Sequence, residues 1–478
     1  MKRKRTKIVA TISDKNCETS FIRELYEAGM DVVRINSAHL SVEGALKIIR
    51  NVRDVSDKIA LLLDTKGPEI RTTACDVPIA VKKESNINIT GDPEKKSSDA
   101  NIYVNLPSFA EEVPLRSIIM IDDGELELKV IKKQGNTLIC KALNEGTLGS
   151  RKSVNVPGVR IDLPSVTEKD RTFIKMAAEN DVDFIAHSFV RSRQDILDVR
   201  KVIDQYDSKI KIIAKIENQE GVENFNDILE EAYGIMVARG DLAIEIPYEK
   251  IPSIQRMMIS RCIYSRKPVI VATQMLHSMI NNPRPTRAEV SDIASAIYSQ
   301  TDAIMLSGET AGGRYPVEAV KTMTKVALEV ENNKEKFLDT PYLNITGEIS
   351  GYLSRVAVET SLRIAAKGII ADTMQGRTIR NMASFRGYNL ILAQCYSART
   401  MRELALSYGV YSNLQEKRKS VDEFIHIALR NLTKTHDLRE SDIVVVLAGN
   451  FSGRSGFSFI EVGSVQYLKD RISIKEEK

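Results

Sequence analysis

Two short apolar stretches of the chain each end in charged residues that could hold a metal ion or a phosphoryl group. In the first, Ile212 to Gly221, Lys215 and Glu217 follow a β-branched run. The second, Gly234 to Asp241, ends in Arg239-Gly240-Asp241. A buried strand normally excludes acids and lysines, because desolvating a charge is costly. The repeated pattern therefore predicts chemistry at the carboxyl ends of successive strands, as in a parallel α/β barrel.

The residue types at these two strand ends suit a divalent metal and a developing negative charge. Glu217 and Asp241 supply hard oxygen ligands of the kind that Mg²⁺ or Mn²⁺ prefers. Lys215 could neutralise negative charge that develops during a reaction. Alternatively, the carboxylates only form ion pairs with Lys215 and Arg239. A Schiff-base role for Lys215 is also conceivable, but acidic neighbours keep its ammonium group protonated and oppose that chemistry.

Two earlier strand ends carry groups that could bind anions. Arg34 and Asn36 alternate along one strand and would face the barrel mouth together. An inward arginine there favours bidentate binding of phosphate or carboxylate, with a structural ion pair as the alternative. His39 comes three residues after Asn36 and could either contact a ligand or be an ordinary loop histidine. The next strand ends in Asp64 to Arg71, a polar segment with Gly-Pro hinge residues, which predicts a mobile lid or a plain domain junction.

The last two strand ends carry weaker signals. Thr273 and Gln274 end an apolar run, and a hydroxyl there could bind a carboxylate, relay a proton or cap the strand. Thr286 and Glu289 form a capping box that predicts a helix through Ile297. The glycine-rich turn at 307–313 stands where barrels often bind phosphate.

Eight β-branched runs alternate with amphipathic segments and predict the elements that position these residues. The number of strands indicates a (β/α)8 barrel. The helical segments include Thr19–Glu27, Ala45–Val55 and Thr167–Glu179. The expected strands are Lys7–Thr11, Val32–Asn36, Ile59–Asp64, Asp183–His187, Lys211–Lys215, Gly234–Ala238, Pro268–Thr273 and Ala303–Ser307.

The remaining sequence predicts two further domains. Alternating runs with Gly-Asn and Asp-Gly turns indicate a small antiparallel β domain inserted after the third strand, with almost no helix signal. Beyond about residue 340, a helix and parallel-strand runs at 368–371, 390–393 and 443–448 indicate a doubly wound α/β domain. We thus expect a catalytic barrel at 1–66 and 164–340, an inserted lid at 67–163 and a C-terminal domain at 341–478, whose regulatory role stays open.

Composition places the chain among globular proteins without indicating a partner. Its 478 residues include 68 basic and 64 acidic side chains, and no apolar run approaches a membrane span. Five dispersed cysteines without a C-x-x-C pair favour reduced thiols in the cytoplasm. The basic run Lys2-Arg3-Lys4-Arg5 is predicted to be a solvated tail, with a nucleic-acid or sorting role as the alternative.

Taken together, these motifs resemble the pyruvate kinase family over nearly the whole chain. Their order and the inserted β domain match the family as well. The segments that carry the resemblance are Val33–Asn36, Asp64–Arg71, Lys215–Gly221, Gly234–Pro247, Ala272–Met275, Pro285–Asp292 and Asp302–Ala311. The resemblance implies a phosphotransferase that moves the phosphoryl group of phosphoenolpyruvate to ADP, giving pyruvate and ATP in the last step of glycolysis.

The resemblance also implies a role for each matched residue. Glu217 and Asp241 would hold Mg²⁺ or Mn²⁺, and Lys215 would stabilise the transferred phosphoryl group and the enolate. The implied phosphate contacts are Arg34 and Arg71, and the other substrate contacts are Gly240, Asp241, Thr273 and Ser188. The implied nucleotide contacts are His39, Lys152, Arg71 and Asn36. Such a division agrees with phosphoryl transfer, which needs positioning and charge neutralisation more than covalent chemistry.

Several positions depart from the family pattern. A K⁺ site is implied at Asn36, Asp64 and Thr65, but Ala38 replaces a serine that helps to bind the ion. The segment at 11–16 lacks a Gly and a Pro that the family carries near the nucleotide base. His187 and Ala243 replace an alanine and a glycine, for which we have no account.

Regulation, assembly and rival functions stay open at this level. The loop at 373–378 aligns with the sugar-phosphate loop of regulated members, but Met374 and Gln375 remove hydroxyl donors; Arg377, Thr378 and the loop at 452–456 could still hold an anion, so regulation by fructose 1,6-bisphosphate is undecided. The family also implies a homotetramer, with no nucleic-acid or membrane partner. One rival function is a metal-dependent lyase that acts on phosphoenolpyruvate or pyruvate, but such an enzyme would need no inserted domain that closes over a nucleotide. The other is a catalytically silent homologue, which would show losses among Arg34, Lys215, Glu217, Asp241 and Thr273, yet all five are present.

Overall fold

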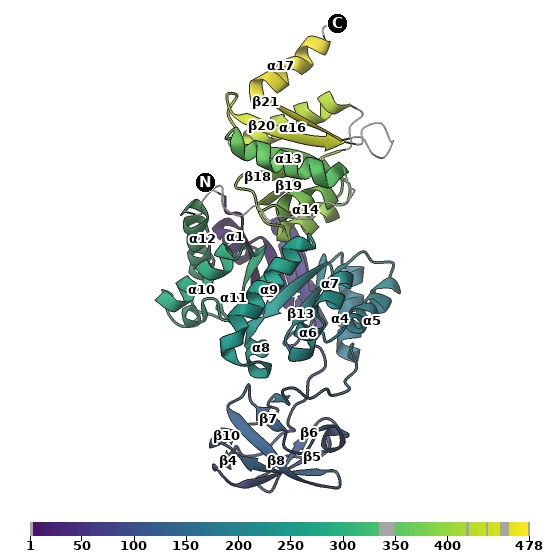
Figure 1. Cartoon of the computed structure of the whole chain (residues 1–478), viewed down its shortest axis with the longest axis vertical. Coiled ribbons are helices and arrows are strands. Elements are labelled where there is room, and N and C mark those ends of the chain that lie inside the picture. Colours follow the sequence, from purple (N-terminus) through teal and green to yellow (C-terminus); the bar gives the residue numbers. More distant parts are fainter. Residues whose placement is uncertain (1–2, 334–348, 417–419, 436–437, 450–457, 477–478) are drawn as a thin grey trace.

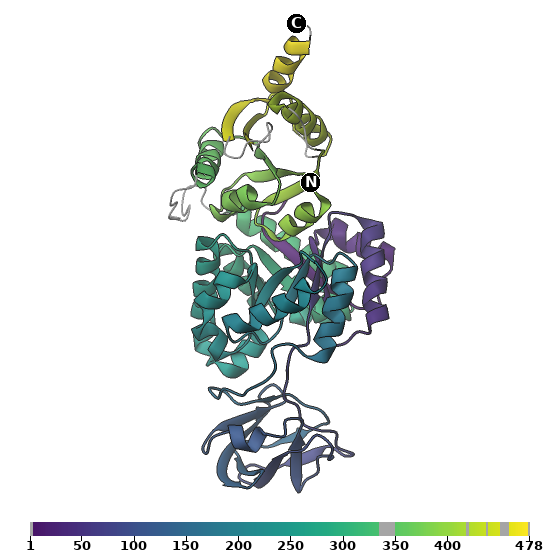
Figure 2. The ribbon, with the colours of Figure 1, turned by 90° about the vertical axis from the view of Figure 1, so that its right-hand side faces the viewer.

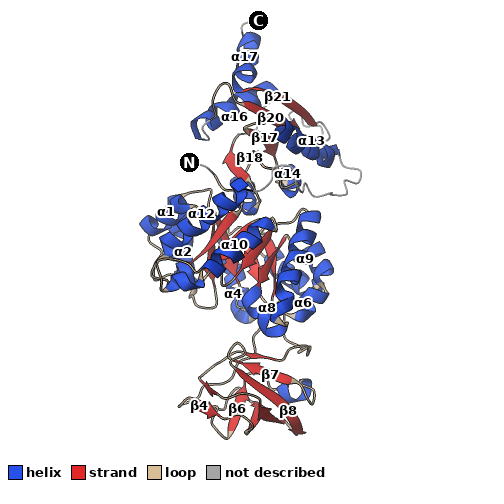
Figure 3. Cartoon of the chain, turned by 60° about the vertical axis from the view of Figure 1, so that its left-hand side comes forward, coloured by secondary structure: helices blue, strands red, loops and turns tan. Residues whose placement is uncertain are grey.

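The structure, a computed structural model, describes residues 3–333, 349–416, 420–435, 438–449 and 458–476. It has three parts stacked along its long axis (Figures 1 and 2). A closed barrel of parallel strands forms the middle part, with its helices outside (Figure 3). A β region and an α/β region lie at opposite ends of this barrel.

The barrel strands close in the order β1-β16-β15-β14-β13-β12-β3-β2. All eight predicted strands are confirmed to within one residue at each end. They are β1 (Lys7–Ile12), β2 (Val32–Asn36), β3 (Ala60–Asp64), β12 (Phe184–His187), β13 (Lys211–Ile216), β14 (Gly234–Ala238), β15 (Val269–Ala272) and β16 (Ala303–Leu306).

Helices cover the outside of this barrel because alternate strand residues face inward and outward. On β1, Val9 packs inside the barrel with Met236, whereas Ile8 joins the larger core under the helices. The predicted capping box is present: the Thr286 hydroxyl accepts the Glu289 N–H at 3.2 Å, and the Glu289 carboxylate accepts the Thr286 N–H at 2.8 Å. The helices are α1 (Thr19–Ala28), α2 (Val42–Val55), α4 (Glu168–Glu179), α5 (Arg193–Asp204), α6 (Gln219–Glu223), α7 (Phe225–Glu231), α8 (Arg239–Glu245), α9 (Ile251–Tyr264), α10 (Arg287–Tyr298), α11 (Gly308–Ala311) and α12 (Pro316–Asn333).

The inserted β region leaves the barrel after β3 and returns before α4. Six of its strands form a sheet in the order β11-β7-β8-β9-β5-β6, in which the β5–β6 pair is parallel; β4 and β10 form a separate pair. Its own apolar core includes Ile89, Leu128 and Phe109. Its elements are β4 (Ile79–Val81), β5 (Asn86–Gly91), β6 (Asn101–Val104), α3 (Phe109–Glu112), β7 (Ile118–Ile121), β8 (Leu126–Gln134), β9 (Thr137–Ala142), β10 (Gly146–Leu148) and β11 (Val154–Asn155).

The C-terminal α/β region has a five-stranded sheet in the order β19-β18-β17-β20-β21. The three predicted strands are present as β17, β18 and β20. The two edge strands were not predicted: β19 runs parallel to β18, and β21 runs antiparallel to β20. Its elements are α13 (Ile349–Arg363), β17 (Gly368–Thr373), α14 (Arg377–Ser384), β18 (Leu390–Cys395), α15 (Ala398–Glu403), β19 (Val410–Leu414), α16 (Val421–Thr435), β20 (Ile443–Gly449), β21 (Ser458–Ser464) and α17 (Val465–Glu476). The predicted domain boundaries stay predictions, and the one at 340–341 lies outside the described residues.

The C-terminal α/β region docks on the amino-end side of the barrel strands. Arg386 donates two hydrogen bonds to Asp302 at 2.7 and 2.6 Å, and Arg402 donates to Asp183 at 2.7 Å. The N-terminal basic run lies at this junction: only 4% of Lys4 and 8% of Arg5 are exposed. The prediction of a solvated tail is therefore wrong for Lys4 and Arg5, because the α/β region covers them.

Candidate active site

Lys215 lies at the centre of a buried cluster at the carboxyl ends of β3, β12 and β13. Its ammonium nitrogen is 3.0 Å from Oδ1 of Asp64, 3.0 Å from Oε1 of Glu217 and 2.6 Å from the Ser188 hydroxyl. Burial by itself lowers the pKa of Lys215, but the attraction of Asp64 and Glu217 outweighs it and raises that pKa well above its usual value. Lys215 therefore keeps its positive charge, which argues against the Schiff-base alternative.

Arg34 and Asp64 form a second buried ion pair beside this lysine. The Arg34 Nε donates to Oδ2 of Asp64 at 2.6 Å, and its NH1 donates to the Thr11 hydroxyl at 3.0 Å. Burial raises the pKa of Asp64, but Arg34 and Lys215 outweigh burial and lower it. The structural ion pair that was one alternative for Arg34 is present, and it orients the guanidinium group next to Lys215.

Glu217 and Asp241 lie close enough for their charges to interact. The Glu217 carboxylate accepts the Phe189 N–H at 2.6 Å. Burial, followed by the charge of Glu217, raises the pKa of Asp241 to about 7. Two carboxylates that repel each other in a buried site are relieved by a shared cation, so the donor set fits a divalent metal ion. Among the described residues no group of three or more His, Cys, Asp or Glu could hold a metal, so further ligands would have to come from substrate or water.

Thr273 is held in an unusual backbone conformation at the end of β15. Its φ is 70°, a left-handed value that β-branched residues rarely adopt. The Thr273 hydroxyl accepts the Gly240 N–H at 2.8 Å and donates to the Ala272 carbonyl at 2.7 Å. Strain of this kind persists where surrounding contacts enforce it, and it is frequent at active sites.

Arg239 provides those surrounding contacts. Its NH2 donates to the Thr273 carbonyl at 2.6 Å, and its NH1 contacts both carboxylate oxygens of Asp292 at 2.7 and 2.6 Å. The predicted alternative, an ion pair between Arg239 and Asp241, is thus replaced by a pair with Asp292. Sequence reasoning missed Asp292, because it lies on α10, more than fifty residues from Arg239.

Ser188 and Thr65 join β12 to β3 behind the cluster. The Ser188 hydroxyl lies 2.7 Å from the Thr65 carbonyl, and the Ser188 N–H donates to the Thr65 hydroxyl at 3.1 Å. His187 Nδ1 lies 3.2 Å from that hydroxyl, which gives this unusual histidine a contact within the site. A Cβ on Gly67 would come within 2.9 Å of Ser188, so only glycine permits this close approach.

The predicted K⁺ ligands lie side by side, but each is already engaged. Asn36 and Asp64 are paired residues of β2 and β3. The side-chain oxygen of Asn36 accepts the Ala38 N–H at 3.1 Å, and Asp64 binds Arg34 and Lys215. His39 is exposed on the loop beyond.

The predicted contacts from the inserted β region bind local partners within that region. Lys152 lies 2.8 Å from Asp122, and the Arg71 Nε lies 2.7 Å from Glu69. Within the described ranges of the chain, no hydrogen bond or ion pair joins either residue to the Lys215 cluster. Asp123, which sequence reasoning missed, is near enough to Asp241 to add to the rise of its pKa. The Asp122-Asp123-Gly124 turn was the only sequence signal for it.

Three findings bear on the remaining predictions. The 373–378 loop is ordered by the Gly376 N–H, which donates to the Thr373 hydroxyl at 2.8 Å, whereas the loop at 452–456 lies outside the described residues. All five cysteines are free thiols. Within the described part of the chain, no helix is long and apolar enough to cross a membrane.

Comparison with known proteins agrees with this geometry over both main parts of the chain. The family described as "Pyruvate kinase, barrel domain" matches residues 3–320, and "Pyruvate kinase, alpha/beta domain" matches residues 352–462. A pyruvate kinase of Borreliella burgdorferi is 47% identical, over 97% of this chain and 98% of its own length. Those of Geobacillus stearothermophilus and Staphylococcus aureus are 41% and 40% identical, each over 95% of this chain and 79% of their own length. The chain therefore belongs to the pyruvate kinase family.

Proposed function

We propose that the protein transfers the phosphoryl group of phosphoenolpyruvate to ADP, giving pyruvate and ATP, as the last step of glycolysis. As a member of the pyruvate kinase family it is a phosphotransferase. The observation that carries the proposal is the position of Lys215, whose ammonium group is held between Asp64 at the end of β3 and Glu217 just after β13. A fixed positive charge of this kind stabilises the charge that phosphoryl transfer spreads over oxygen atoms.

The substrate phosphate would bind among the cationic side chains of the barrel mouth. Lys215 on β13 and Arg34 on β2 present their charges to the two oxygens of Asp64, and Arg71 would add a third charge once the inserted β region approaches. The Ser188 hydroxyl accepts a hydrogen bond from Lys215 and so lies beside the expected phosphate site. Gly240 and Asp241, at the start of α8, would border the substrate carboxylate. Because Asp64 fixes both Arg34 and Lys215, little reorganisation is needed when the anion arrives.

Glu217 and Asp241 would hold the divalent metal, Mg²⁺ or Mn²⁺. When bound, this ion neutralises charge on the substrate oxygens. Burial and then the charge of Glu217 raise the pKa of Asp241, and the contribution of Glu217 supports the assignment because a cation between the two carboxylates removes their repulsion. Asn36, Asp64 and Thr65 would hold K⁺, with Ala38 supplying no side-chain oxygen.

Thr273 would act at the enolate carbon. Its hydroxyl hydrogen bonds with Gly240 and Ala272 fix the oxygen at the mouth of the barrel, where it can border the substrate and pass on a proton. Arg239 is the positioning residue that holds this threonine in place.

The nucleotide would bind between the barrel and the inserted β region, which would act as a lid. His39 and Asn36 lie on the barrel side, and Lys152 and Arg71 on the lid side, where each has an acidic partner that ADP phosphates could replace. We further propose a cytoplasmic homotetramer that needs no nucleic acid or membrane.

One assay tests this function directly. Pyruvate formation is measured with phosphoenolpyruvate, ADP and Mg²⁺, with and without K⁺. We expect turnover that depends on both substrates and on the metal, with a stimulation by K⁺. Absence of ATP formation under every metal condition would refute the proposal, and a rate indifferent to K⁺ would refute only the monovalent site.

A further inference from the structure

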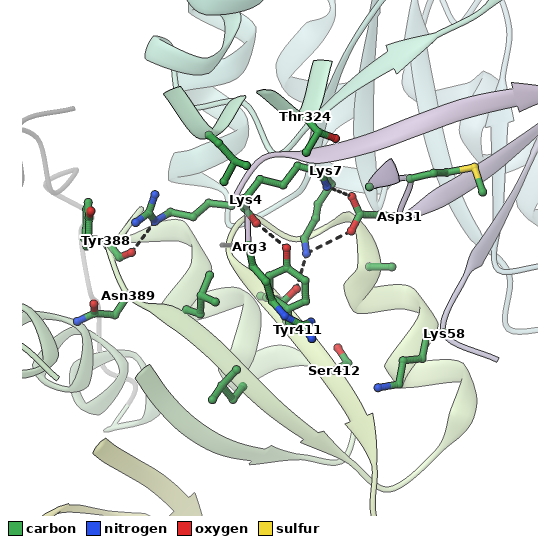
Figure 4. Close-up of a pocket in the computed structure, with 18 of the residues that line it drawn as sticks. Arg3, Lys4, Lys7, Asp31, Lys58, Thr324, Tyr388, Asn389, Tyr411 and Ser412 are labelled. Atoms are coloured by element: carbon green, nitrogen blue, oxygen red, sulfur yellow. Dashed lines mark hydrogen bonds and ion pairs between the residues drawn. The ribbon is translucent and has the colours of Figure 1, made fainter. Parts of the chain in front are cut away.

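A cavity of about 920 Å³ lies between the barrel and the C-terminal α/β region (Figure 4). It adjoins the amino ends of the barrel strands, whereas the active site lies at their carboxyl ends. It is lined by the N-terminal segment, by the amino ends of barrel strands and by β18 and β19. Its volume falls in the range of about 300–1,000 Å³ that is typical of small-molecule sites. The proposed reaction assigns nothing to this cavity.

The charges around the cavity are strongly unbalanced. Six lining side chains are cationic and only two are acidic. The cationic residues are Arg3, Lys4, Arg5, Lys7, Lys58 and Lys367, and the acidic ones are Glu27 and Asp31. Lys4, Arg5 and Lys7 are buried, whereas Arg3, Lys58 and Lys367 are exposed. Positive charge concentrated around one cavity attracts anions, so this arrangement favours an anionic occupant.

The protein compensates part of this charge with acids and carbonyl groups. Lys4 pairs with Asp31, and Lys7 lies 3.7 Å from the same carboxylate. The Lys7 ammonium group also donates to the Val410 carbonyl at 2.5 Å and lies 3.9 Å from the centre of the Tyr411 ring. Arg5 pairs at 3.3 Å with Glu331, which does not itself line the cavity. Asp31 thus serves two lysines and Glu331 one arginine, and the net charge of the group stays positive.

Among the described residues, the only hydrogen-bond partner of the Lys58 ammonium group is neutral: it donates to the Asn413 side chain at 2.6 Å. Burial lowers the pKa of Lys58, and the positive charge of Arg3 lowers it further. Burial also lowers the pKa of Lys7, to about 8. The charge of Asp31 opposes this shift, and the charges of Lys4 and Arg3 add to it. The positive charge of Arg3 in the N-terminal segment therefore lowers the pKa values of both Lys7 and Lys58 around the same cavity.

We propose that this cavity binds a phosphate-bearing small molecule, whose anionic group lies among Arg3, Lys7 and Lys58. Phosphate matches the site because its several oxygens can accept hydrogen bonds from ammonium and guanidinium groups at once. The volume exceeds that of inorganic phosphate, so an organic phosphate fills it better, and the Tyr388 and Tyr411 rings offer its carbon skeleton apolar surface.

The cavity is connected to the active site through three barrel strands. Lys7 begins β1, which ends near Thr11, the acceptor for Arg34. Asp31 directly precedes β2, which carries Arg34, and Lys58 precedes β3, which ends in Asp64. The distance spanned from Lys58 to Asp64 is roughly 20 Å, at about 3.3 Å per residue. A ligand that fixes the amino ends of these strands can therefore alter the affinity for phosphoenolpyruvate.

Calorimetric titration of the full chain with pyrophosphate tests the proposal. The buffer contains EDTA, and the titration is repeated with excess phosphoenolpyruvate to occupy the active site. We expect one pyrophosphate site per chain that phosphoenolpyruvate does not displace. Glycerol 2-phosphate is the organic monoester probe, and malonate is the control for a dicarboxylate.

Two substitutions locate the binding site. The R3Q/K58Q double variant should weaken pyrophosphate binding at least about tenfold, since each removes a charged hydrogen-bond donor. Lys209→Gln is the matched control, because Lys209 also stands two residues before a barrel strand but does not line the cavity. Its affinity for pyrophosphate should equal that of the wild type. Basal activity and the thermal midpoint are measured for each variant.

A second measurement keeps the proposal falsifiable if R3Q/K58Q does not fold. Pyrophosphate should protect Lys58, but not Lys209, from acetylation in the wild-type protein. Equal affinity of the double variant and the wild type would overturn the proposal, because pyrophosphate would then bind elsewhere. Absence of wild-type binding at about 10 mM would do the same. Malonate binding as tight as that of pyrophosphate would overturn the assignment to phosphate.

Discussion

The Lys215 ammonium nitrogen lies 3.0 Å from Oδ1 of Asp64, although 151 residues separate the two along the chain. The contact spans β12, which lies between β3 and β13 in the barrel. Asp64 also binds Arg34, so one carboxylate orients both cations of the barrel mouth. A shared acid of this kind fixes the two positive charges before an anion arrives.

Lys215→Met should lower kcat by about 10³-fold, because the variant loses the charge that stabilises the transferred group. Arg34 remains with Asp64, so phosphoenolpyruvate should still bind, as calorimetry would show. Lys211→Met is the control, because Lys211 lies at the opposite end of the same strand. A near-normal kcat of Lys215→Met would show that another residue neutralises the charge.

Glu217→Gln should lower the apparent Mg²⁺ affinity by at least about tenfold, because the variant loses one of two anionic oxygen ligands. Electron paramagnetic resonance of bound Mn²⁺ measures this directly, without turnover. Glu220→Gln, a change in the following helix α6, should leave Mn²⁺ binding unchanged. Wild-type Mn²⁺ affinity in Glu217→Gln would remove Glu217 from the metal site.

Asp292→Asn should lower kcat by about 10- to 100-fold through the position of Thr273. Arg239 would lose its ionic partner, and its hold on the Thr273 carbonyl would weaken. The Kd for phosphoenolpyruvate should change much less than kcat, and Asp292→Glu should recover part of the rate. Asp227→Asn on the exposed face of α7 is the control; equal losses of kcat in both variants would contradict the positioning role.

Asp372→Asn should stabilise the protein at neutral pH. Burial raises the pKa of Asp372 from its ordinary 3.8 to about 6, although hydrogen bonds from Tyr396 and Gly449 oppose the shift. Between these values the folded state binds more protons than the unfolded state, so wild-type stability falls as pH rises. Above pH 6 the variant should gain about 2 kcal/mol in unfolding free energy.

Thermal unfolding at a series of pH values checks this sign. The difference in midpoint between Asp372→Asn and the wild type should grow from pH 4 to pH 6 and then level off. Asp470→Asn, which removes an exposed charge from α17, should show no such rise. A constant difference across the range would mean that Asp372 is ionised throughout.

The sequence was sufficient to predict the barrel because its strands are short β-branched runs with a charged or polar residue at the end. Those runs set the register of each strand, so Lys215, Glu217 and Thr273 could be assigned to carboxyl ends before any contact was known. The strands β19 and β21 were missed because edge strands carry a weaker apolar pattern, here Val410–Leu414 and Ser458–Ser464. Strand-end chemistry is thus local information.

Only the tertiary structure decided which charged groups meet. Asp64 binds both Arg34 and Lys215, and Arg239 binds Asp292 instead of Asp241, because the order of strands and helices in space differs from their order in sequence. The composition around Lys4 and Arg5 predicts a solvated tail, yet the docked α/β region buries both residues. Burial depends on what the rest of the chain places over a residue, and no local pattern specifies that.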